Sequence, residues 1–484
     1  MLNFYAFDDE IVLWWDKDRS KKEYAVFVSG KLIAKTDRTF YRISSLSQDT
    51  EYFVKVEDIG EKKIRTPRRK KRLDITQAPY FAVGDGKTVN TRAIQQALTD
   101  CKADECVYVP NGTFLVGALD VYSDSELYVS KGAVLKGSED PSDYLPKIRS
   151  RFEGIEGECY RSLINAGTLD KNGAYNCKNV VIRGGGVISG GGKTLCEEII
   201  ERERLRLKNF MAANPDLVNS CECERTLPGR ARGRLIAIHN CQNAVICDLT
   251  LQYAPSWNVH FVYSENVLTF GCKIESQGVW NGDGWDPDSS ENCTVFDTVF
   301  HTHDDAIAIK SGKNPEGNVI AKPAKNIRIF SCKGRNGIAI GSEMSGGVDG
   351  VYIWDCDFSS SYVGIRLKFT KKRGGYIRNV HVYDSALVNI NASAVTYNDD
   401  GEAAPNMPKI EDCSFENVKL SAFSSNLTNN VNQEVIPIVV YGVPEQTLIR
   451  NFRFSSVSVL RKVVKEKEVC YASDIFFDGE KYGE

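Results

Sequence analysis

A stretch of 34 residues, Val279 to Gly312, gathers carboxylates at an unusual density. It reads VWNGDGWDPDSSENCTVFDTVFHTHDDAIAIKSG and contains six aspartates, two of them adjacent. Carboxylates held close together raise one another's pKa and cost stability, so such a group usually handles a ligand or a proton. A protonated carboxyl near an ionised one is what hydrolysis of a glycosidic bond requires, because the first protonates the leaving oxygen and the second activates water.

An internal repeat predicts how these carboxylates are positioned. The unit begins with Asn, has apolar residues at its second, fourth and ninth positions, and has a small or apolar residue at its seventh position. It begins at Asn179, Asn243, Asn266, Asn292, Asn326, Gly350 (with Gly in place of Asn), Asn379 and Asn451. From Asn243 to Asn379 the starts lie 23, 26, 34, 24 and 29 residues apart, which is the period of a stacked solenoid. Because the units alternate like strands, we expect a right-handed parallel β-helix whose coils stack about 4.8 Å apart.

On this frame, Asp283 and the pair Asp304 and Asp305 come from successive coils, each just beyond the strand that begins a repeat. We therefore expect three carboxylates side by side on one face. Taken singly, each motif also has an interpretation without function: DGWDPD could be a simple turn, and the Asp pair could lie in an exposed loop. The repeat also predicts an inward ladder, since a buried Cys behaves as a small hydrophobe; its members are Cys272, Cys332 and Cys356.

The two ends of the repeat region differ from the repeat itself. NTRAIQQALTDC, from Asn90, predicts a short helix that caps the open end of the solenoid. Before it, EIVLWWD, EYAVFVSG, KLIAKT, TFYRISSL and TEYFVKVED alternate like strands and predict a small antiparallel β-sandwich over residues 1–66, which resembles a fibronectin type III module. The basic cluster RTPRRKKR overlaps the segment 67–73, which we interpret as a linker. We expect the charges of this cluster to be solvated and favour that interpretation over a nucleic-acid-binding patch. The solenoid is expected to occupy residues 74–484.

Composition narrows the classes of partner. Lys plus Arg total 61 against 64 Asp plus Glu, which argues against nucleic acid as the main partner. No apolar run is long enough for a membrane span, and the N-terminal segment lacks the pattern of a secretory signal. Fifteen scattered cysteines favour reduced thiols and a cytoplasmic protein. Cys221 and Cys223 have no second ligand pair at suitable spacing, so we expect neither a metal nor another cofactor.

Four motifs, NGDGWDPDSS, DDAIAIKSG, GIAIGSEMSGG and GIRLKF, occur in this order and together resemble glycoside hydrolase family 28, the polygalacturonases and related pectin hydrolases. The resemblance extends over about residues 74 to 460. It implies an inverting hydrolase of galacturonate-containing pectic oligosaccharides, derived from homogalacturonan or rhamnogalacturonan. By the same resemblance, Asp283 and Asp305 would activate water, Asp304 would protonate the leaving oxygen, and Arg366 with Lys368 would bind the sugar carboxylate. An Arg and a Lys two residues apart on a strand do face the same side.

Two positions depart from the family pattern. Asn336 stands where the family usually has a histidine, and Asn can form hydrogen bonds but cannot titrate. Conversely, His303 precedes the aspartate pair, where relatives commonly have Gly; it either compensates or is an ordinary loop residue, as His301 is. Trp257 and His260 are further candidates for contacting the sugar, with core packing as the equal alternative.

The mode of action is also suggested by resemblance. The GSEMSGG run and the sandwich at the front are similar to bacterial exo-acting members, and a charged insertion from Cys196 to Arg234, helical at its start, would close one end of a groove. Two other functions remain open: a pectate lyase, which would need Ca²⁺ and a proton-abstracting base, and a β-helix that binds uronates without turnover.

Overall fold

The computed structural model describes residues 1–398, 400–425, 432–444, 446 and 448–483. The chain forms two compact units, the first made of Met1–Arg72 with Lys102–Cys106, the second of Leu73–Cys101 with Val107–Glu484. Within the described part of the chain, no helix combines the length and the apolar character that crossing a membrane requires.

The first unit is an antiparallel β-sandwich of seven strands. One sheet has the order β1-β2-β5 and the other β4-β3-β6-β7. The strands are β1 (Leu2–Ala6), β2 (Glu10–Trp15), β3 (Tyr24–Val28), β4 (Lys31–Thr36), β5 (Phe40–Ser44), β6 (Glu51–Val56) and β7 (Gly60–Arg65). Alternate residues of the two sheets face one core that includes Trp15, Tyr24 and Val54. The five strands expected from sequence are present, and β1 and β7 complete the two sheets.

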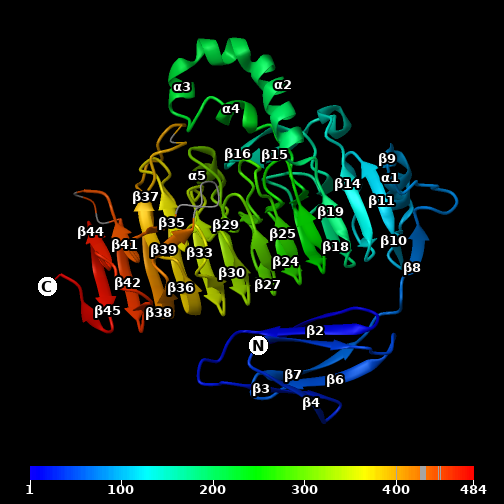
Figure 1. The fold of residues 1–484 in the computed structure, drawn as a ribbon, viewed down its shortest axis with the longest axis horizontal. Helices are drawn as coiled ribbons and strands as arrows, with labels where there is room; N and C mark the ends of the chain where they lie inside the picture. The colour runs from blue at the N-terminus through cyan, green and yellow to red at the C-terminus, as the bar shows by residue number, and fades with distance from the viewer. Residues whose placement is uncertain (399, 426–431, 445, 447, 484) are drawn as a thin grey trace. The chain divides into compact units, whose positions relative to one another are not determined.

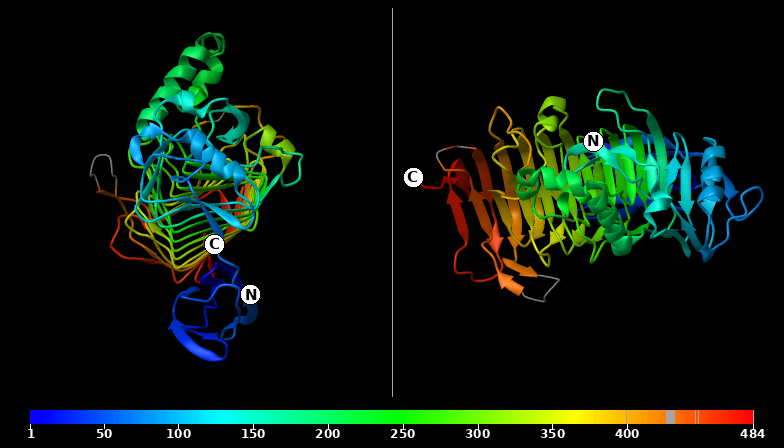
Figure 2. Two further views of the ribbon diagram at one scale, coloured as in Figure 1. Left: turned by 90° about the vertical axis from the view of Figure 1, so that its right-hand side faces the viewer. Right: turned by 90° about the horizontal axis from the view of Figure 1, so that it is seen from above.

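The second unit is the expected right-handed parallel β-helix (Figure 1). One face is an 11-stranded parallel sheet. Its strands are β12 (Leu119–Val121), β17 (Ile164–Ala166), β20 (Ile236–His239), β23 (Val259–Val262), β26 (Trp285–Asp288), β29 (Ile307–Ile309), β32 (Ile338–Ile340), β35 (Ile365–Phe369), β37 (Ile390–Ala394), β41 (Ile438–Tyr441) and β44 (Lys467–Cys470). Seen along the stack, successive coils superpose as nested outlines (Figure 2, left).

A 24-stranded sheet forms the other faces and contains the repeat found in the sequence. The repeat units correspond to β18 (Cys177–Arg183), β21 (Cys241–Cys247), β24 (Glu265–Phe270), β27 (Thr294–Phe296), β30 (Ala324–Phe330), β33 (Val348–Trp354), β36 (Tyr376–Leu387) and β42 (Ile449–Ser455). The first residue of every unit has a left-handed backbone, for example φ of 63° at Asn243 and 79° at Gly350. Asn and Gly tolerate that conformation best, which explains the repeat's signature.

Asparagine side chains also join neighbouring coils. Asn266 Nδ2 donates to Asn243 Oδ1 over 3.0 Å, and Asn243 Nδ2 donates to Asn179 Oδ1 over 3.0 Å. Inside the coils, branched aliphatic residues form one continuous core that includes Cys272, Cys332 and Cys356. The inward cysteine ladder is therefore confirmed.

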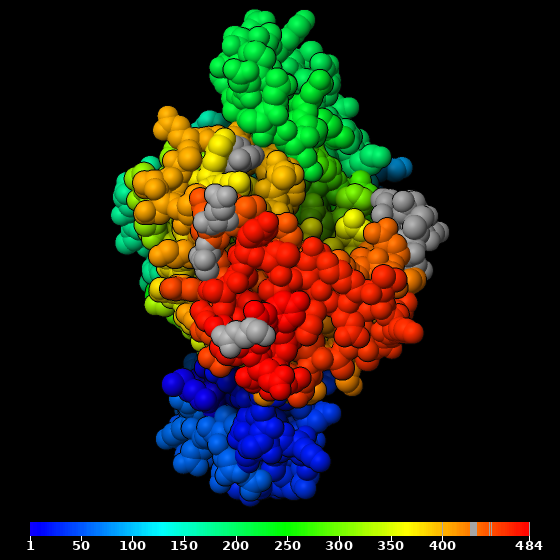
Figure 3. All heavy atoms as spheres, turned by 90° about the vertical axis from the view of Figure 1, so that its left-hand side faces the viewer, coloured from blue at the N-terminus to red at the C-terminus, as the bar shows by residue number. Residues whose placement is uncertain are grey.

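Helices stand at the N-terminal end of the stack and in the insertion. The expected cap helix is α1 (Thr91–Asp100), whose Ile94, Ala97 and Leu98 join the core. The insertion starts as predicted with a helix, α2 (Gly192–Ala213), followed by α3 (Pro215–Asn219) and α4 (Thr226–Gly229). These helices project from the coils (Figure 1, and Figure 3, green). A hairpin, β15 (Ile148–Phe152) with β16 (Ile155–Cys159), and helix α5 (Glu316–Ile320) lie in other loops.

Candidate active site

The coil register brings the predicted site residues into a column. Val259, Trp285, Ile307 and Ile338 begin β23, β26, β29 and β32 and pair with one another in parallel register. The residues two positions earlier therefore stack in adjacent coils. They form what we call the aspartate column: Trp257, Asp283, Asp305 and Asn336.

Asp304 completes a cluster with two members of this column. Carboxylate oxygens of Asp283, Asp304 and Asp305 all lie within 4.8 Å of one another. The cluster lines a pocket of about 350 Å³, and the same pocket is lined by His303, Asn336, Arg366, Lys368 and Trp257. The structure thus gathers eight of the nine predicted site residues in one place.

His260 is the exception. It is fully buried on β23, with its Nε2 3.5 Å from Asp288 Oδ2, and it does not line the pocket. Burial lowers the pKa of His260 to about 4, so the ring is neutral at physiological pH. Its position corresponds to the packing alternative, because the ring is fully buried and lies edge-on against Trp257, with the two ring centroids 4.9 Å apart.

Trp257 lines the pocket. Only 2% of its surface is exposed, and its ring stacks on Phe152 with centroids 4.7 Å apart. The Nζ of Lys310 lies 4.3 Å from the centre of the Trp257 ring. Packing and pocket lining therefore coexist at this residue.

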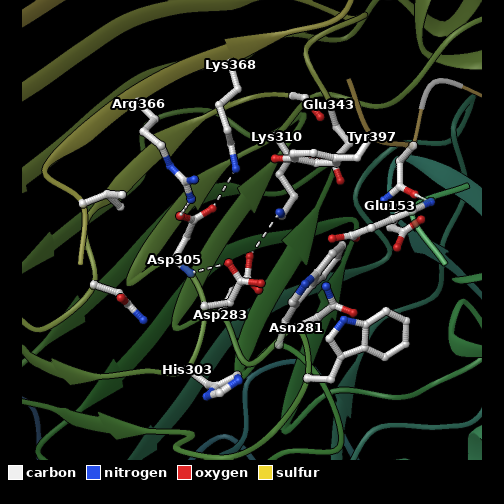
Figure 4. A pocket seen from close by; sticks show the side chains of 18 of the residues that line it. Glu153, Asn281, Asp283, His303, Asp305, Lys310, Glu343, Arg366, Lys368 and Tyr397 are labelled. Atoms are coloured by element: carbon white, nitrogen blue, oxygen red, sulfur yellow. Dashed lines mark hydrogen bonds and ion pairs between the residues drawn. The ribbon is translucent and has the colours of Figure 1, made fainter. Parts of the chain in front are cut away.

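Two cations hold Asp305. Arg366 Nη2 donates to Asp305 Oδ1 over 2.5 Å, and Lys368 Nζ donates to Oδ2 over 2.9 Å (Figure 4). Both come from β35, two coils further along, and the residue of the intervening strand β32 that pairs with Arg366 is the small Ala339. Although burial opposes it, Arg366 and Lys368 keep the pKa of Asp305 below its ordinary value.

Asp283 has a different environment. Its Oδ2 lies 3.4 Å from Lys310 Nζ, and its buried Oδ1 has no hydrogen-bond partner in the described structure. Burial raises the pKa of Asp283 well above its ordinary value against the opposing charge of Lys310, and Asp304 and Asp305 raise it further. Asp283 lines the pocket, so its carboxylate group adjoins the space that a substrate would fill.

Asp304 is the most accessible carboxyl of the three. Its Oδ1 accepts a hydrogen bond of 2.8 Å from the backbone N–H of Asp305. No Lys, Arg or His in the described part of the chain forms an ion pair with it, whereas Asp283 and Asp305 both have cationic partners. Asp304 is thus the carboxyl that no cation neutralises.

The two positions that depart from the family pattern lie close to this cluster. Asn336 Nδ2 donates to the carbonyl of Thr302 over 2.9 Å, and His303 Nδ1 accepts a hydrogen bond of 3.3 Å from the N–H of Gly278. Both side chains line the pocket. His301 does not, and its Nδ1 lies 3.6 Å from Glu275 Oε1.

Several pocket residues were missed from the sequence. Lys310 and Glu343 follow β29 and β32 within motifs already singled out, and strand alternation would have placed Lys310 outward with the catalytic residues. Trp280 and Asn281 lie in the aspartate-rich stretch itself, and Lys313 directly follows it. Others come from distant loops and carried no signal: Glu153, Glu222, Arg373, Tyr397 and Asn398.

These loops are joined in a pocket wall, which we define by Glu153, Glu222, Arg230, Asn398 and Asp400. Arg230 from the insertion donates to Glu153 Oε2 over 2.9 Å and to Asp400 Oδ1 over 3.0 Å. The backbone N–H of Glu222 donates to Asn398 Oδ1 over 2.9 Å. Lys313 pairs with Asp400 as well. The wall therefore links the hairpin, the insertion and the loop after β37.

Three carboxylates this close could approach a divalent cation geometrically. However, Lys310, Arg366 and Lys368 already supply compensating positive charge to two of them. We assign the cluster no metal on the basis of that charge balance.

Comparison with known proteins identifies the family of the chain. The family described as glycosyl hydrolases family 28 matches residues 165–436, more than half of the chain. An exo-poly-α-D-galacturonosidase of Dickeya chrysanthemi is 30% identical over 346 residues, 67% of this chain and 56% of that protein. The chain thus spans less than two thirds of the length of this curated relative. The chain belongs to glycosyl hydrolases family 28.

Solved structures share the fold. An exopolygalacturonase of Yersinia enterocolitica superposes with a TM-score of 0.77 at 20% identity, covering 99% of both chains. An exopolygalacturonase of Thermotoga maritima superposes with a TM-score of 0.69 at 24% identity, covering 87% of this chain and 94% of the other.

Proposed function

We propose that this protein is an exo-acting hydrolase of galacturonate-containing pectic oligosaccharides. The observation that carries the proposal is the cluster of Asp283, Asp304 and Asp305 in a pocket that is also lined by Glu153, which Arg230 connects to Asp400. The cluster supplies the acid and base groups of glycoside hydrolysis. We expect the loops joined in the pocket wall to close one end of the binding site, which favours removal of terminal sugars. The name of the Dickeya relative supports the same activity and substrate.

The environments of the carboxyls suggest their roles. Asp304, which no cation neutralises, donates its proton to the glycosidic oxygen as the bond to the anomeric carbon breaks. Water attacks that carbon from the opposite side, and its proton passes to the carboxylate of Asp283, which lines the pocket. Both oxygens of Asp305 are held by cations, so this residue acts as a fixed charge and not as a covalent nucleophile. Such a single displacement inverts the anomeric configuration.

The substrate carboxylate is proposed to bind beside Arg366 and Lys368. Only 28% of the Arg366 side chain is exposed, so a charged group that reaches it is largely desolvated. Arg suits this role because its planar group can bind a carboxylate through two hydrogen bonds.

One experiment tests the function. Purified protein is incubated with a panel of saturated and unsaturated homogalacturonan and rhamnogalacturonan oligosaccharides, and the products are separated by chromatography. Release of saturated monosaccharide from chain ends supports the proposal, and the productive oligosaccharide identifies the linkage. Products that absorb in the ultraviolet would indicate a lyase, and binding without turnover would indicate a uronate-binding β-helix.

Two further assignments belong to this proposal. A fibronectin type III-like identity for the first unit is supported by its seven strands in sheets of three and four. A cytoplasmic location is supported by the fifteen cysteines, all of which are free thiols. Proteolytic release of the first unit as a folded domain tests the first assignment. Fractionation of cells tests the second.

A further inference from the structure

We propose that Lys310 is a positioning residue for the reaction: its ammonium group, in contact with Oδ2 of Asp283, favours the ionised form of that carboxylate and fixes its orientation. The inference rests on the function proposed above, and it assigns a specific task to a lysine outside the set of acids and substrate-binding cations.

The geometry of Lys310 is that of a desolvated, fixed charge. It follows β29 directly, bridges Asp288 of the preceding coil through the backbone, and is 4% exposed. Its Nζ lies 3.4 Å from Asp283 Oδ2 and 4.3 Å from the centre of the Trp257 ring. Figure 4 shows the side chain extending from the side opposite His303 toward Asp283. Packing against Trp257 therefore holds the ammonium on one oxygen of Asp283.

The charges around Asp283 determine how strongly its ionisation depends on Lys310. Asp304 and Asp305 are the nearest acids, and both favour protonation of Asp283. Among the described residues, Lys310 is the cation that forms an ion pair with Asp283, because Arg366 and Lys368 both pair with Asp305. Three other acids also face Lys310: Glu343, Asp286 and Asp305. The strength of the ion pair between Lys310 and Asp283 therefore depends on the acids around both residues.

The two oxygens of Asp283 consequently differ. Oδ2 faces Lys310, whereas Oδ1 is buried without a partner. The ammonium thus fixes the orientation of the carboxylate group, and a base needs a constant orientation to take a proton from water. Without the lysine, the charge that favours the ionised form and the contact that orients the carboxylate would be lost together.

The test compares pH profiles of kcat/KM for wild type, Lys310→Met and Lys310→Arg on one oligogalacturonide. Met has a similar length but no charge, so the acidic limb of the profile should move upward by about one pH unit, with roughly tenfold lower activity at a fixed pH on that limb. Arg should restore most of the wild-type limb. Lys273→Met is the control, because this lysine pairs with Glu275 and does not line the pocket; its acidic limb should stay in place.

A charge change of opposite sign provides a second test. Glu343 competes for Lys310, so Glu343→Gln should move the acidic limb downward. Infrared titration of the carboxylate band, assigned with Asp283→Asn, reports the same ionisation without turnover and therefore separates this inference from the proposed activity. An unmoved titration of Asp283 in folded Lys310→Met would overturn the inference. Absence of any hydrolysis by wild type would instead overturn the proposed function.

Discussion

Asp283 and Asp305 occupy equivalent positions in adjacent coils, because Trp285 pairs with Ile307, yet their pKa values shift in opposite directions. Burial dominates at Asp283, where one lysine is in contact. At Asp305 the same burial is outweighed by Arg366 and Lys368. Two carboxylates with the same register thus have different chemical and energetic roles.

Asparagine at these two positions should have opposite effects on stability at neutral pH. The raised pKa of Asp283 means that ionisation destabilises the fold as pH rises through the folded value, so Asp283→Asn should increase the melting temperature. The lowered pKa of Asp305 means that its ionisation stabilises the fold above about pH 4 and that this contribution is lost as pH falls through the folded value. Asp305→Asn should destabilise, by about 3–5 kcal/mol if both cations stay buried.

Calorimetry from pH 3 to pH 8 measures both variants, with Asp357→Asn as a control, because Asp357 is exposed at the start of strand β34 (Asp357–Phe358). Both site variants should also be inactive. Equal and same-sign shifts of the melting temperature at pH 7 would contradict the assigned environments.

Asp304→Asn should abolish most turnover while leaving the fold intact. The amide preserves the shape but has no carboxyl proton to donate, and loss of general acid help costs about 10²–10⁴-fold in rate. Steady-state kinetics on an oligogalacturonide and on a substrate with a good leaving group check this, since the latter needs less protonation and should be impaired less. Activity within a few-fold of wild type on both would remove Asp304 from the acid role.

Lys368→Met should weaken recognition of the sugar carboxylate. A charge-assisted hydrogen bond contributes about 1.5–3 kcal/mol, but Lys368 also pairs with Asp305. Activity of wild type and variant is therefore compared on a uronate substrate and on its carboxyl-reduced analogue. Loss of the Lys368–Asp305 ion pair lowers activity on both substrates, whereas loss of carboxylate binding lowers activity on the uronate alone. The wild type should prefer the uronate and the variant should prefer it much less. A wild type indifferent to carboxyl reduction would exclude the carboxylate site.

Arg230→Met should loosen the pocket wall. This change removes the link from the insertion to both Glu153 and Asp400, leaving Asp400 with Lys313. We expect slower release of monosaccharide and a larger fraction of longer products, measured by chromatography over time. Arg204→Met is the control, because Arg204 pairs with Glu201 on the exposed part of α2. An unchanged product distribution in Arg230→Met would show that the wall does not set the mode of cleavage.

His303 and Asn336 allow a test of compensation. We expect that Asn336→His does not create strong polygalacturonase activity and that His303→Gly lowers turnover only modestly, because Lys310, Arg366 and Lys368 already serve the aspartates. Turnover is measured for both single variants and for the double variant on matched oligosaccharides. If the double variant regains activity that His303→Gly has lost, the two positions are coupled and His303 belongs to the catalytic apparatus.

Much of the fold and the column of the site followed from the sequence alone. Asn at the start of each unit recurs because the backbone there is left-handed, so the repeat could be read without coordinates. Once the repeat was known, Asp283, Asp304, Asp305 and Asn336 had to lie on adjacent coils, since parallel register carries equivalent positions into contact.

Tertiary structure alone decided which charges meet. The pairing of Lys310 with Asp283, of Arg366 with Asp305, and of Arg230 with Glu153 and Asp400 depends on side chains that cross coils and on loops of unequal length. It also decided that His260, at an outward position of its strand, is fully buried beside Trp257 and Asp288. The periodic part of a solenoid repeats one local rule, whereas its loops are placed only by contacts between segments far apart in the chain, and those contacts leave no period in the sequence.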